Sequence, residues 1–296
     1  MKLRTNTERL VRMGVSAKVD PPFMRSGYRI SPDGEARVLP SVGGVVYNVL
    51  CGDPALGWAA DHIEPGASVG LPHKEGPALA ALSRLAQVGN TVRVLSGAAR
   101  GARGTVTGKH GGIEHLIVDF AVRDLKKLAS GDTVQVDAFG LGLELLDFPE
   151  VTPMNVDPVL LAKMKLSRSK GKLSVPVALT VPAELMGSGL GHDSGHSGDY
   201  DLQCSDPRSV KKWGIEKLRL GDIVAITDAD HTFGRIFRKG AVTIGIVSHG
   251  DCVQAGHGPG VTTLLTSASG AIVPRISKKA NIADILRIGR SRGKSK

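Results

Sequence analysis

The sequence predicts a mainly β protein with a few short helices, built in two parts. Glycine and proline are frequent, at 38 and 16 of 296 residues, and long helical patterns are few. Apolar residues instead alternate with polar ones over short stretches, which is the period-two pattern of half-buried strands. A chain of this length with 41% hydrophobic residues can bury two separate cores. We therefore expect an N-terminal β part over residues 1–150 and a C-terminal β domain over residues 151–288.

The N-terminal part contains the clearest strand pattern, between Gly89 and Phe120. Before it, residues 36–40 and 44–50 predict strands and residues 77–87 predict a short helix. Within the main pattern, valines alternate with polar residues and glycines stand where tight turns need a positive φ. The spacing resembles the KOW motif of ribosomal and transcription-elongation proteins, through Gly89, Val92, Val94, Gly97, Arg100, Gly101, Gly104 and Val106. The resemblance implies a small SH3-like barrel over about 89–148, and it implies no ligand or reaction.

Helix starts and apolar stretches organise the C-terminal domain. Asp157-Pro158 and Asp206-Pro207 each combine an N-cap carboxylate with proline at the first helical position, and Asn281 precedes a final short helix. Four stretches predict strands, namely 173–182, 220–226, 240–247 and 261–266. The prolines in the first stretch favour an edge position in the sheet. Residues 289–296 have no apolar face, and we expect them to form a disordered basic tail.

The net charge of +10 is concentrated near the C-terminal end. Residues 275–296 hold eight basic residues and one acidic residue, so the other 274 residues carry only +3. Because affinity for nucleic acid grows with the number of phosphates that are neutralised, a nearly neutral body argues against a dedicated nucleic-acid protein. Aromatic residues, which stack on bases, make up only 4% of the chain.

The beginning of the sequence and the cysteines suggest the compartment. The first residues lack the apolar core of a signal peptide, and no run approaches the roughly 18 apolar residues of a membrane span. Cys51, Cys204 and Cys252 are odd in number and far apart, which argues against a disulfide framework. We expect a cytoplasmic protein without a membrane partner.

The strongest candidate site lies where the predicted C-terminal strands end. Asp228 and Asp230 are two residues apart, so both carboxylates point to one side of an extended backbone. His249 ends the next strand, and His257 lies in the loop after it. Carboxylates and imidazoles are typical ligands of a divalent metal, which would make these four residues both ligands and catalytic candidates. Around His257, Gly256, Gly258 and Gly260 would let backbone amides approach an anionic group.

Simpler interpretations of this stretch remain open. Asp228 and Asp230 can cap a turn, and the histidines can satisfy local backbone groups. Cys252, beside His249, can be a nucleophile, but a buried structural thiol is the more common case.

Two further groups have the right residue types for chemistry. Asp61, His62 and Glu64, with His110, can supply a general base, and Lys109 and His115 are close to His110 in sequence. The alternative for this group is a salt-bridged loop packed against the barrel. His192, Asp193 and His196 resemble a metal site by count, but a glycine- and serine-rich loop is more often a mobile lid. Whether the first group meets the C-terminal one cannot be read from the sequence.

Five segments resemble the DUF4438 family, a two-part, mainly β family of unknown function. They are Gly57-Trp-Ala-Ala-Asp-His-Ile-Glu-Pro-Gly, Thr107-Gly-Lys-His-Gly-Gly, Met186-Gly-Ser-Gly, Leu220-Gly-Asp-Ile-Val-Ala-Ile and Ala255-Gly-His-Gly-Pro-Gly. The resemblance spans nearly the whole chain except the basic tail. It implies a barrel-containing N-terminal part and a separate C-terminal part, and it implies no activity.

Three functions are therefore open. The first is an enzyme, a metal-dependent hydrolase or lyase on a small polar substrate, with His62, Glu64 or His110 assisting the C-terminal site. The second is an RNA-binding or ribosome-associated protein that uses the basic tail or the barrel residues Arg93, Arg100, Arg103 and Lys109. The third is a structural oligomer. The excess of Asp, His and Gly at predicted strand ends favours the enzyme, and we expect it to be a homo-oligomer.

Overall fold

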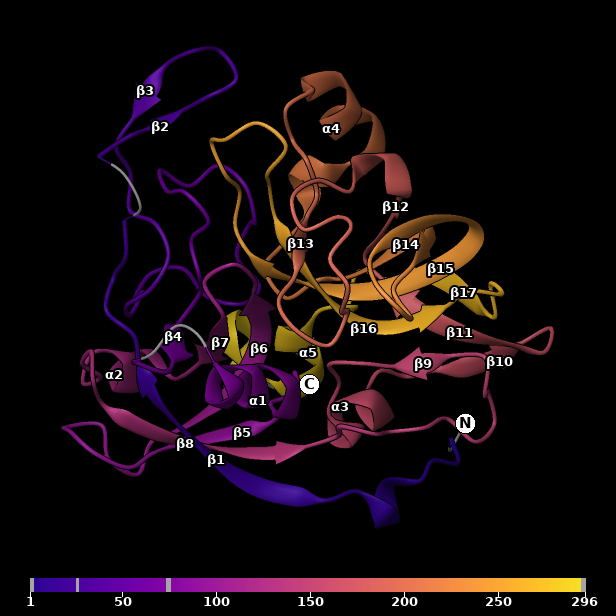
Figure 1. The fold of residues 1–296 in the computed structure, drawn as a ribbon, viewed down its shortest axis with the longest axis horizontal. Coiled ribbons are helices and arrows are strands. Elements are labelled where there is room, and N and C mark those ends of the chain that lie inside the picture. Colours follow the sequence, from indigo (N-terminus) through magenta and orange to yellow (C-terminus); the bar gives the residue numbers. More distant parts are fainter. Residues whose placement is uncertain (1–2, 25–26, 73–75, 294–296) are drawn as a thin grey trace.

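The protein is mainly β, with two β parts joined by short helices and loops (Figure 1). The computed structural model describes residues 3–24, 27–72 and 76–293. None of the helices in these ranges has the length and the hydropathy needed to cross a membrane. The predicted fold class is confirmed, because a closed barrel forms the N-terminal part and separate sheets form the C-terminal part.

The barrel closes in the strand order β1-β4-β7-β6-β5-β8, and every neighbouring pair is antiparallel. Its strands are β1 (Arg12–Val19), β4 (Ala67–Gly70), β5 (Thr91–Val94), β6 (Arg103–His110), β7 (His115–Asp119) and β8 (Thr133–Phe139). Val92, Val94 and Val106 are buried in its core, as their alternation predicts. The barrel is larger than the expected range of about 89–148, because β1 pairs with β8 over seven registered positions. β1 was not predicted, although Met13, Val15, Ala17 and Val19 alternate with its other residues and Ala17 and Val19 are buried.

The rest of the N-terminal part is short elements and loops. Beside the 3-10 turn η1 (Thr7–Arg9), it contains the two-residue strands β2 (Arg29–Ile30) and β3 (Ala36–Arg37) and the helices α1 (Pro77–Leu85) and α2 (Val122–Leu125). The stretch 44–50 was expected to be a strand, but it forms only an isolated bridge between Val45 and Ala67.

The C-terminal part consists of a six-stranded and a three-stranded sheet. The larger sheet runs β12 (Leu179–Pro182), β14 (Ile223–Asp230), β15 (Ile236–His249), β16 (Gly260–Ser267) and β13 (Tyr200–Asp201), and β9 (Thr152–Pro153) also pairs with β16. The smaller sheet contains β10 (Ser167–Ser169), β11 (Lys172–Val177) and β17 (Ile272–Ile276). The helices are α3 (Pro158–Lys163), α4 (Pro207–Trp213) and α5 (Ile282–Leu286), with the 3-10 turns η2 (Ala183–Leu185), η3 (Ile215–Lys217) and η4 (Gly289–Ser291). Asp157, Asp206 and Asn281 accept backbone N–H bonds at the three helix starts, as predicted.

The prolines of the first C-terminal stretch occupy positions that do not interrupt a ladder. β12 lies at the edge of the larger sheet, and Pro182 is its last residue. β11 is central in the smaller sheet, but β10 pairs only with residues 172–174 of it. Pro176 therefore lies beyond the end of β10, where the missing N–H breaks no bond to that neighbour.

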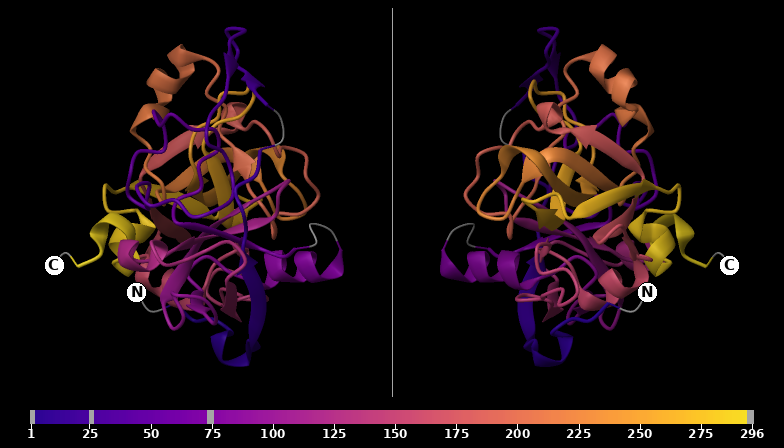
Figure 2. Two further views of the ribbon diagram at one scale, coloured as in Figure 1. Left: turned by 90° about the vertical axis from the view of Figure 1, so that its left-hand side faces the viewer. Right: turned by 90° about the vertical axis from the view of Figure 1, so that its right-hand side faces the viewer.

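The two parts contact each other where β6 of the barrel meets β15 and β16. The backbone N–H of Lys109 donates to Oγ1 of Thr262 at 2.9 Å, and this hydroxyl donates to the carbonyl of Lys109 at 3.1 Å. A Cβ on Gly108 would lie 2.3 Å from the Cβ of Ser248, so only glycine permits this approach. The views in Figure 2 show the C-terminal sheet stacked on the barrel. This junction places the end of β6 beside the end of β15.

The C-terminal segment is held against the N-terminal part by ion pairs. Arg290 forms two hydrogen bonds to the carboxylate of Asp53, at 2.6 and 2.7 Å, and Arg292 pairs with Asp119. Residues 289–293 were expected to be disordered. They pack against the N-terminal part instead, because these ion pairs hold them there. Residues 294–296 lie outside the described range.

Candidate metal centre

Four histidines from distant parts of the chain gather at the junction of the two parts. The ring centroid of His62 lies 5.6 Å from that of His110, 5.1 Å from that of His249 and 5.3 Å from that of His257. The rings of His110 and His249 stack with their centroids 4.1 Å apart. His62 comes from a loop of the N-terminal part, His110 ends β6, His249 ends β15, and His257 follows in the next loop. The two groups that the sequence left apart therefore form one cluster.

Each of these histidines has its Nδ1 atom next to an oxygen acceptor. The Nδ1 atom of His110 lies 2.7 Å from Oε1 of Glu64, and that of His62 lies 3.3 Å from Oδ1 of Asp61. In His249 and His257, Nδ1 lies 2.8 Å and 3.1 Å from the carbonyl oxygens of Gly250 and Ala255. An acceptor on Nδ1 fixes the tautomer in which Nε2 carries a free lone pair. Metal-binding histidines are held in this way by the groups around them.

Two carboxylates, Asp199 and Asp201, lie among the imidazoles. Nε2 of His249 is 2.8 Å from Oδ2 of Asp199 and 3.5 Å from Oδ1 of Asp201, and Nε2 of His62 is 3.6 Å from Oδ2 of Asp201. The side chain of His249 is fully buried, yet neither of its contacts has hydrogen-bond geometry, and within the described part of the chain Nε2 has no hydrogen-bond partner. Two ligand atoms that share one metal are about 3.0–3.4 Å apart for bonds near 2.1 Å. The 3.5 and 3.6 Å contacts of Asp201 lie close to this spacing. The 2.8 Å contact between His249 and Asp199 has the length of a direct ion pair, and it would widen on joint coordination.

Asp228 and Asp230 do not take part in this cluster. A β-bulge between Thr227 and Ala229 interrupts the strand, and Asp228 adopts a left-handed conformation with φ 58°. Its carboxylate caps the N–H of Gly240, while Asp230 binds Thr232 and forms an ion pair with Arg238. Among the described residues, the groups with metal-ligand spacing contain neither aspartate. The expected convergence with the histidines fails because the bulge breaks the regular alternation of side chains.

Asp199 and Asp201 were not among the predicted site residues, although their spacing in the sequence could have indicated them. They have the same two-residue spacing as Asp228 and Asp230, and they directly follow the glycine- and serine-rich loop. What the sequence could not supply was the pairing of β13 with β16, which places Asp201 opposite Gly260. Arg235 was missed as well. Its buried guanidinium donates to the carbonyls of Asp199 and Ser197 and so holds the chain that carries the two aspartates.

Behind the cluster, Glu64 belongs to a second layer of buried charges. It accepts hydrogen bonds from Gly43 N–H and the Ser68 hydroxyl, and it contacts both His110 and His115. Burial opposes ionisation of Glu64, but the two histidines hold its pKa well below the usual value. His115 also lies 2.8 Å from Asp20, and although burial lowers its pKa, the two carboxylates outweigh burial and raise it to about 9.

Lys109, next to His110, has a structural environment. Its side chain is fully buried, and Nζ donates to the Ser83 carbonyl, the His196 carbonyl and, at 2.6 Å, Oδ1 of Asn155. Burial lowers its pKa to about 7. None of these three partners belongs to the four clustered histidines. Ser83 lies in the N-terminal part and Asn155 and His196 lie in the C-terminal part, so Lys109 joins the two parts beside the site.

Electrostatics favour a cation between the carboxylates and the imidazoles. Burial alone would lower the pKa of His249, but Asp199 and Asp201 raise it well above its usual value. Burial would likewise raise the pKa of Asp201, and His249 and His62 lower it instead. For His110, burial and the neighbouring His249 together lower the pKa, so this imidazole stays neutral. The pocket therefore stabilises positive charge beside the two aspartates, and it favours the neutral form of the His110 imidazole.

The remaining sequence candidates have peripheral positions. Cys252 lies 3.0 Å from Oδ1 of Asp61, and burial together with this carboxylate raises the thiol pKa, which disfavours a nucleophilic thiolate. His192 and Asp193 form an exposed pair in the glycine- and serine-rich loop. In the part of the chain that the structure describes, these two and His196 belong to no group with metal-ligand spacing.

The three glycines near His257 support the fold of the site rather than an anion cradle. A Cβ on Gly258 would lie 2.0 Å from the carbonyl oxygen of Leu202. On Gly260 it would lie 2.1 Å from both Oδ2 of Asp199 and Nε2 of His249. Gly256 has φ 75° and open space around it. Gly260 thus makes room for the 2.8 Å contact between Asp199 and His249.

A cavity of about 400 Å³ opens onto this cluster. His62, His110, His257, Asp199 and Asp201 line it together with Arg29 and Arg235. Arg29 is held by Asp61 at 3.3 Å and by the side chain of Gln254 at 2.8 Å. The cavity is therefore polar, and its volume suits a small molecule.

Comparison with known proteins places the chain in a family. Two models match, the domain of unknown function DUF4438, N-terminal, over residues 28–162 and its C-terminal counterpart over residues 163–286. The chain belongs to the DUF4438 family. The solved structure titled "Crystal structure of TM1086" is 47% identical, covers 96% of this chain and 99% of its own, and superposes with a TM-score of 0.91. No curated protein matches the chain. The predicted family is confirmed, and it carries no assigned activity.

Proposed function

We propose that this protein is a metal-dependent hydrolase that acts on a small polar substrate. The observation that carries the proposal is the arrangement of four histidines, each with Nδ1 beside an oxygen acceptor, around two buried carboxylates. In a purely structural cluster, the buried Nε2 of His249 would need a hydrogen-bond acceptor with good geometry. A bound cation satisfies this atom and offsets the carboxylates at the same time.

The donor set indicates which metals fit. Imidazole nitrogens and carboxylate oxygens together suit Zn²⁺, Fe²⁺, Mn²⁺ or Ni²⁺ better than Ca²⁺ or Cu⁺. Among the described residues, three groups of ligand atoms lie close enough. They are His249 with Asp199 and Asp201, His62 with His257 and Asp201, and His62 with Asp61 and Cys252. Asp61 contacts Nδ1 of His62, and Glu64 contacts Nδ1 of His110. Carboxylates in these positions commonly orient metal-binding imidazoles.

The chain itself supplies a base and a substrate cavity. A metal held by these residues would polarise an acyl or phosphoryl oxygen and would lower the pKa of water. His110 is neutral, and because its Nδ1 faces Glu64, its Nε2 can accept a proton from that water. Glu64 then stabilises the imidazolium that forms. Arg29, at the wall of the cavity, is placed to orient an anionic group of the substrate.

The proposal is tested on untagged protein by metal analysis and a hydrolase screen. We expect bound metal in the purified protein. We also expect hydrolysis of at least one model ester, lactone, amide or phosphate ester, lost on chelation and restored by metal. His249→Ala should lose metal and activity, whereas Asp228→Asn, a carboxylate change in the same domain, should keep both. Absence of metal from purified and metal-supplemented protein would refute the proposal. Metal with elimination products in place of hydrolysis would make the protein a lyase.

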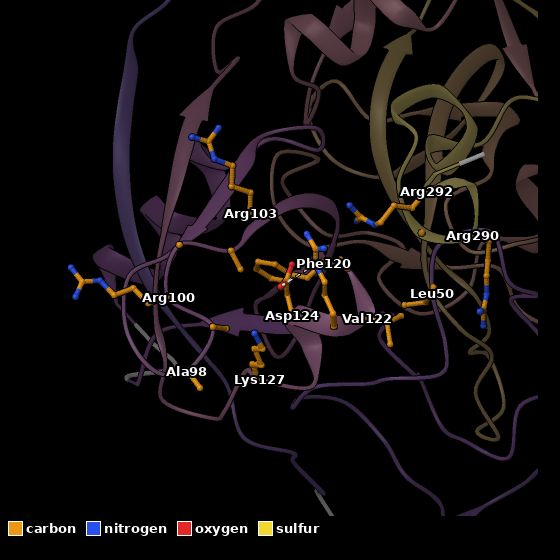
Figure 3. Close-up of a pocket in the computed structure, with 16 residues that line it drawn as sticks. Leu50, Ala98, Arg100, Arg103, Phe120, Val122, Asp124, Lys127, Arg290 and Arg292 are labelled. Atoms are coloured by element: carbon orange, nitrogen blue, oxygen red, sulfur yellow. Dashed lines mark ion pairs between the residues drawn. The ribbon is translucent and has the colours of Figure 1, made fainter. Parts of the chain in front are cut away.

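A second candidate, RNA binding, is favoured by a different cavity. This cavity of about 1070 Å³ lies between the barrel and the C-terminal segment, and its wall contains Arg100, Arg103, Arg123, Lys127, Arg290 and Arg292 (Figure 3). The segment's arginines, however, are paired with Asp53 and Asp119, and Figure 3 shows Arg100 and Arg103 pointing in different directions. Lys109 is buried and unavailable. Salt-sensitive binding of a single-stranded RNA, reduced by Arg100→Ala with Arg103→Ala, would support this candidate.

A further inference from the structure

We propose that the centre binds two metal ions and that Asp201 bridges them. The inference rests on the proposed function, since it assumes that the histidine–aspartate cluster binds metal. It goes further by assigning separate ligands to each ion. One ion would be held by Asp199, Asp201 and His249, and the other by His62, His257 and Asp201.

The geometry of Asp201 carries the proposal. Its Oδ1 atom lies 3.5 Å from Nε2 of His249, and its Oδ2 atom lies 3.6 Å from Nε2 of His62. The two oxygens of one carboxylate therefore face two different imidazoles, which is how a carboxylate bridges a pair of metals. Paired catalytic metals are typically about 3.5–4 Å apart.

Each half of the site contains its own set of ligand atoms that a cation would bind. The fully buried Nε2 of His249 has no hydrogen-bond partner and points at Asp199 and Asp201. On the other side, His62 and His257 place ligand atoms within 4.8 Å of each other and of Asp201. One ion cannot be bound by all five residues at ordinary bond lengths. Two ligands of one ion with bonds near 2.1 Å lie at most about 4.2 Å apart, and among the described residues the two sets form separate groups at a spacing of 4.8 Å.

The charges around the cluster place its negative side at the two aspartates. Asp199 and Asp201 lie within it, and Asp61 and Glu64 lie directly behind His62 and His110. Asp61 pairs with Arg29 and Glu64 with His115, so Asp199 and Asp201 supply the negative charge that attracts cations. Arg235, a buried cation on the carboxylate side, is directed at backbone carbonyls and not at the carboxylates. Asp199 accepts hydrogen bonds from the Gly111 N–H at 2.8 Å and from the Ser248 hydroxyl at 3.3 Å. Two metals would bind the attacking and leaving oxygens of a hydrolysed group together.

The test is a titration of chelated protein with Co²⁺ and with Mn²⁺. Co²⁺ absorption should rise until two equivalents per chain are bound, and two Mn²⁺ ions should give the exchange-coupled electron paramagnetic resonance spectrum of a bridged pair. His257→Ala and Asp199→Asn should each retain one ion, from opposite halves, and lose the coupling. Asp201→Asn should lose the coupling, and Asp228→Asn should retain two coupled ions. Circular dichroism and thermal melting of the chelated variants check that each is folded.

The outcomes separate this inference from the proposed function. One equivalent in the wild-type protein overturns the pair and leaves a single-metal hydrolase. Two uncoupled ions, or two ions retained with coupling in Asp201→Asn, overturn the bridging role of Asp201. No bound metal overturns both this inference and the proposed function.

Discussion

Gly260→Ala is predicted to damage the metal centre although the substitution adds only one methyl group. The new Cβ would lie 2.1 Å from Oδ2 of Asp199 and 2.1 Å from Nε2 of His249. Carbon needs well over 3 Å from these atoms, so one or both groups must move by roughly 1 Å. Neither can move into solvent, because the side chain of His249 is fully buried and that of Asp199 is 5% exposed. Overpacking of this kind costs about 1–3 kcal/mol of unfolding free energy.

Metal binding should suffer more than stability. Displacing a ligand or its support typically weakens metal affinity 10- to 100-fold, or about 1.4–2.8 kcal/mol. Denaturant unfolding of the chelated protein measures the first effect, and a Co²⁺ titration measures the second. Gly256→Ala is the matched control, because its Cβ would enter open space. Its positive φ costs about 1–2 kcal/mol of stability, while metal affinity should stay unchanged. Wild-type metal affinity in Gly260→Ala would refute the placement of the centre between Asp199 and His249.

Two further predictions concern stability away from the centre. Because Glu64 and Asp20 raise the pKa of His115 from 6.5 to about 9, the charged imidazole stabilises the fold fully below pH about 6.5, and this contribution is lost as the pH rises through about 9. His115→Gln should therefore cost roughly 2–3 kcal/mol at pH 6 and much less at pH 9.5 by denaturant unfolding, and an equal cost at both pH values would contradict the ion pairs. Arg292→Ala leaves the buried carboxylate of Asp119 without its partner and should cost about 1–2 kcal/mol, whereas Arg290→Ala removes an exposed pair and should cost about 0–1 kcal/mol. Thermal melting that ranks the two arginines in the opposite order would show that the C-terminal segment is held by other contacts.

Local features of the fold were readable from the sequence because the interactions that fix them are local. Asp157, Asp206 and Asn281 bind backbone N–H groups two or three residues away, so the residue type and its position are enough to predict a helix start. The alternation of Val92 and Val94 reports directly which side of a strand is buried. β1 has the same alternation at Val15, Ala17 and Val19, although it was not predicted.

The candidate site depended on contacts that no local pattern encodes. His62, His110, His249 and His257 were all singled out by residue type and by their place at predicted strand ends. Their meeting was decided by the packing of β6 against β15 and β16.

The choice of carboxylates was also made by tertiary structure. Asp228-x-Asp230 and Asp199-x-Asp201 have the same spacing in the sequence. A bulge with φ 58° at Asp228 turns the first pair to local backbone partners, and pairing of β13 with β16 turns the second toward His249. The sequence by itself therefore determined the fold class, the helix starts and the chemical nature of the ligands. Only the three-dimensional packing decided which of them share a pocket, because that depends on backbone contacts between residues more than a hundred positions apart.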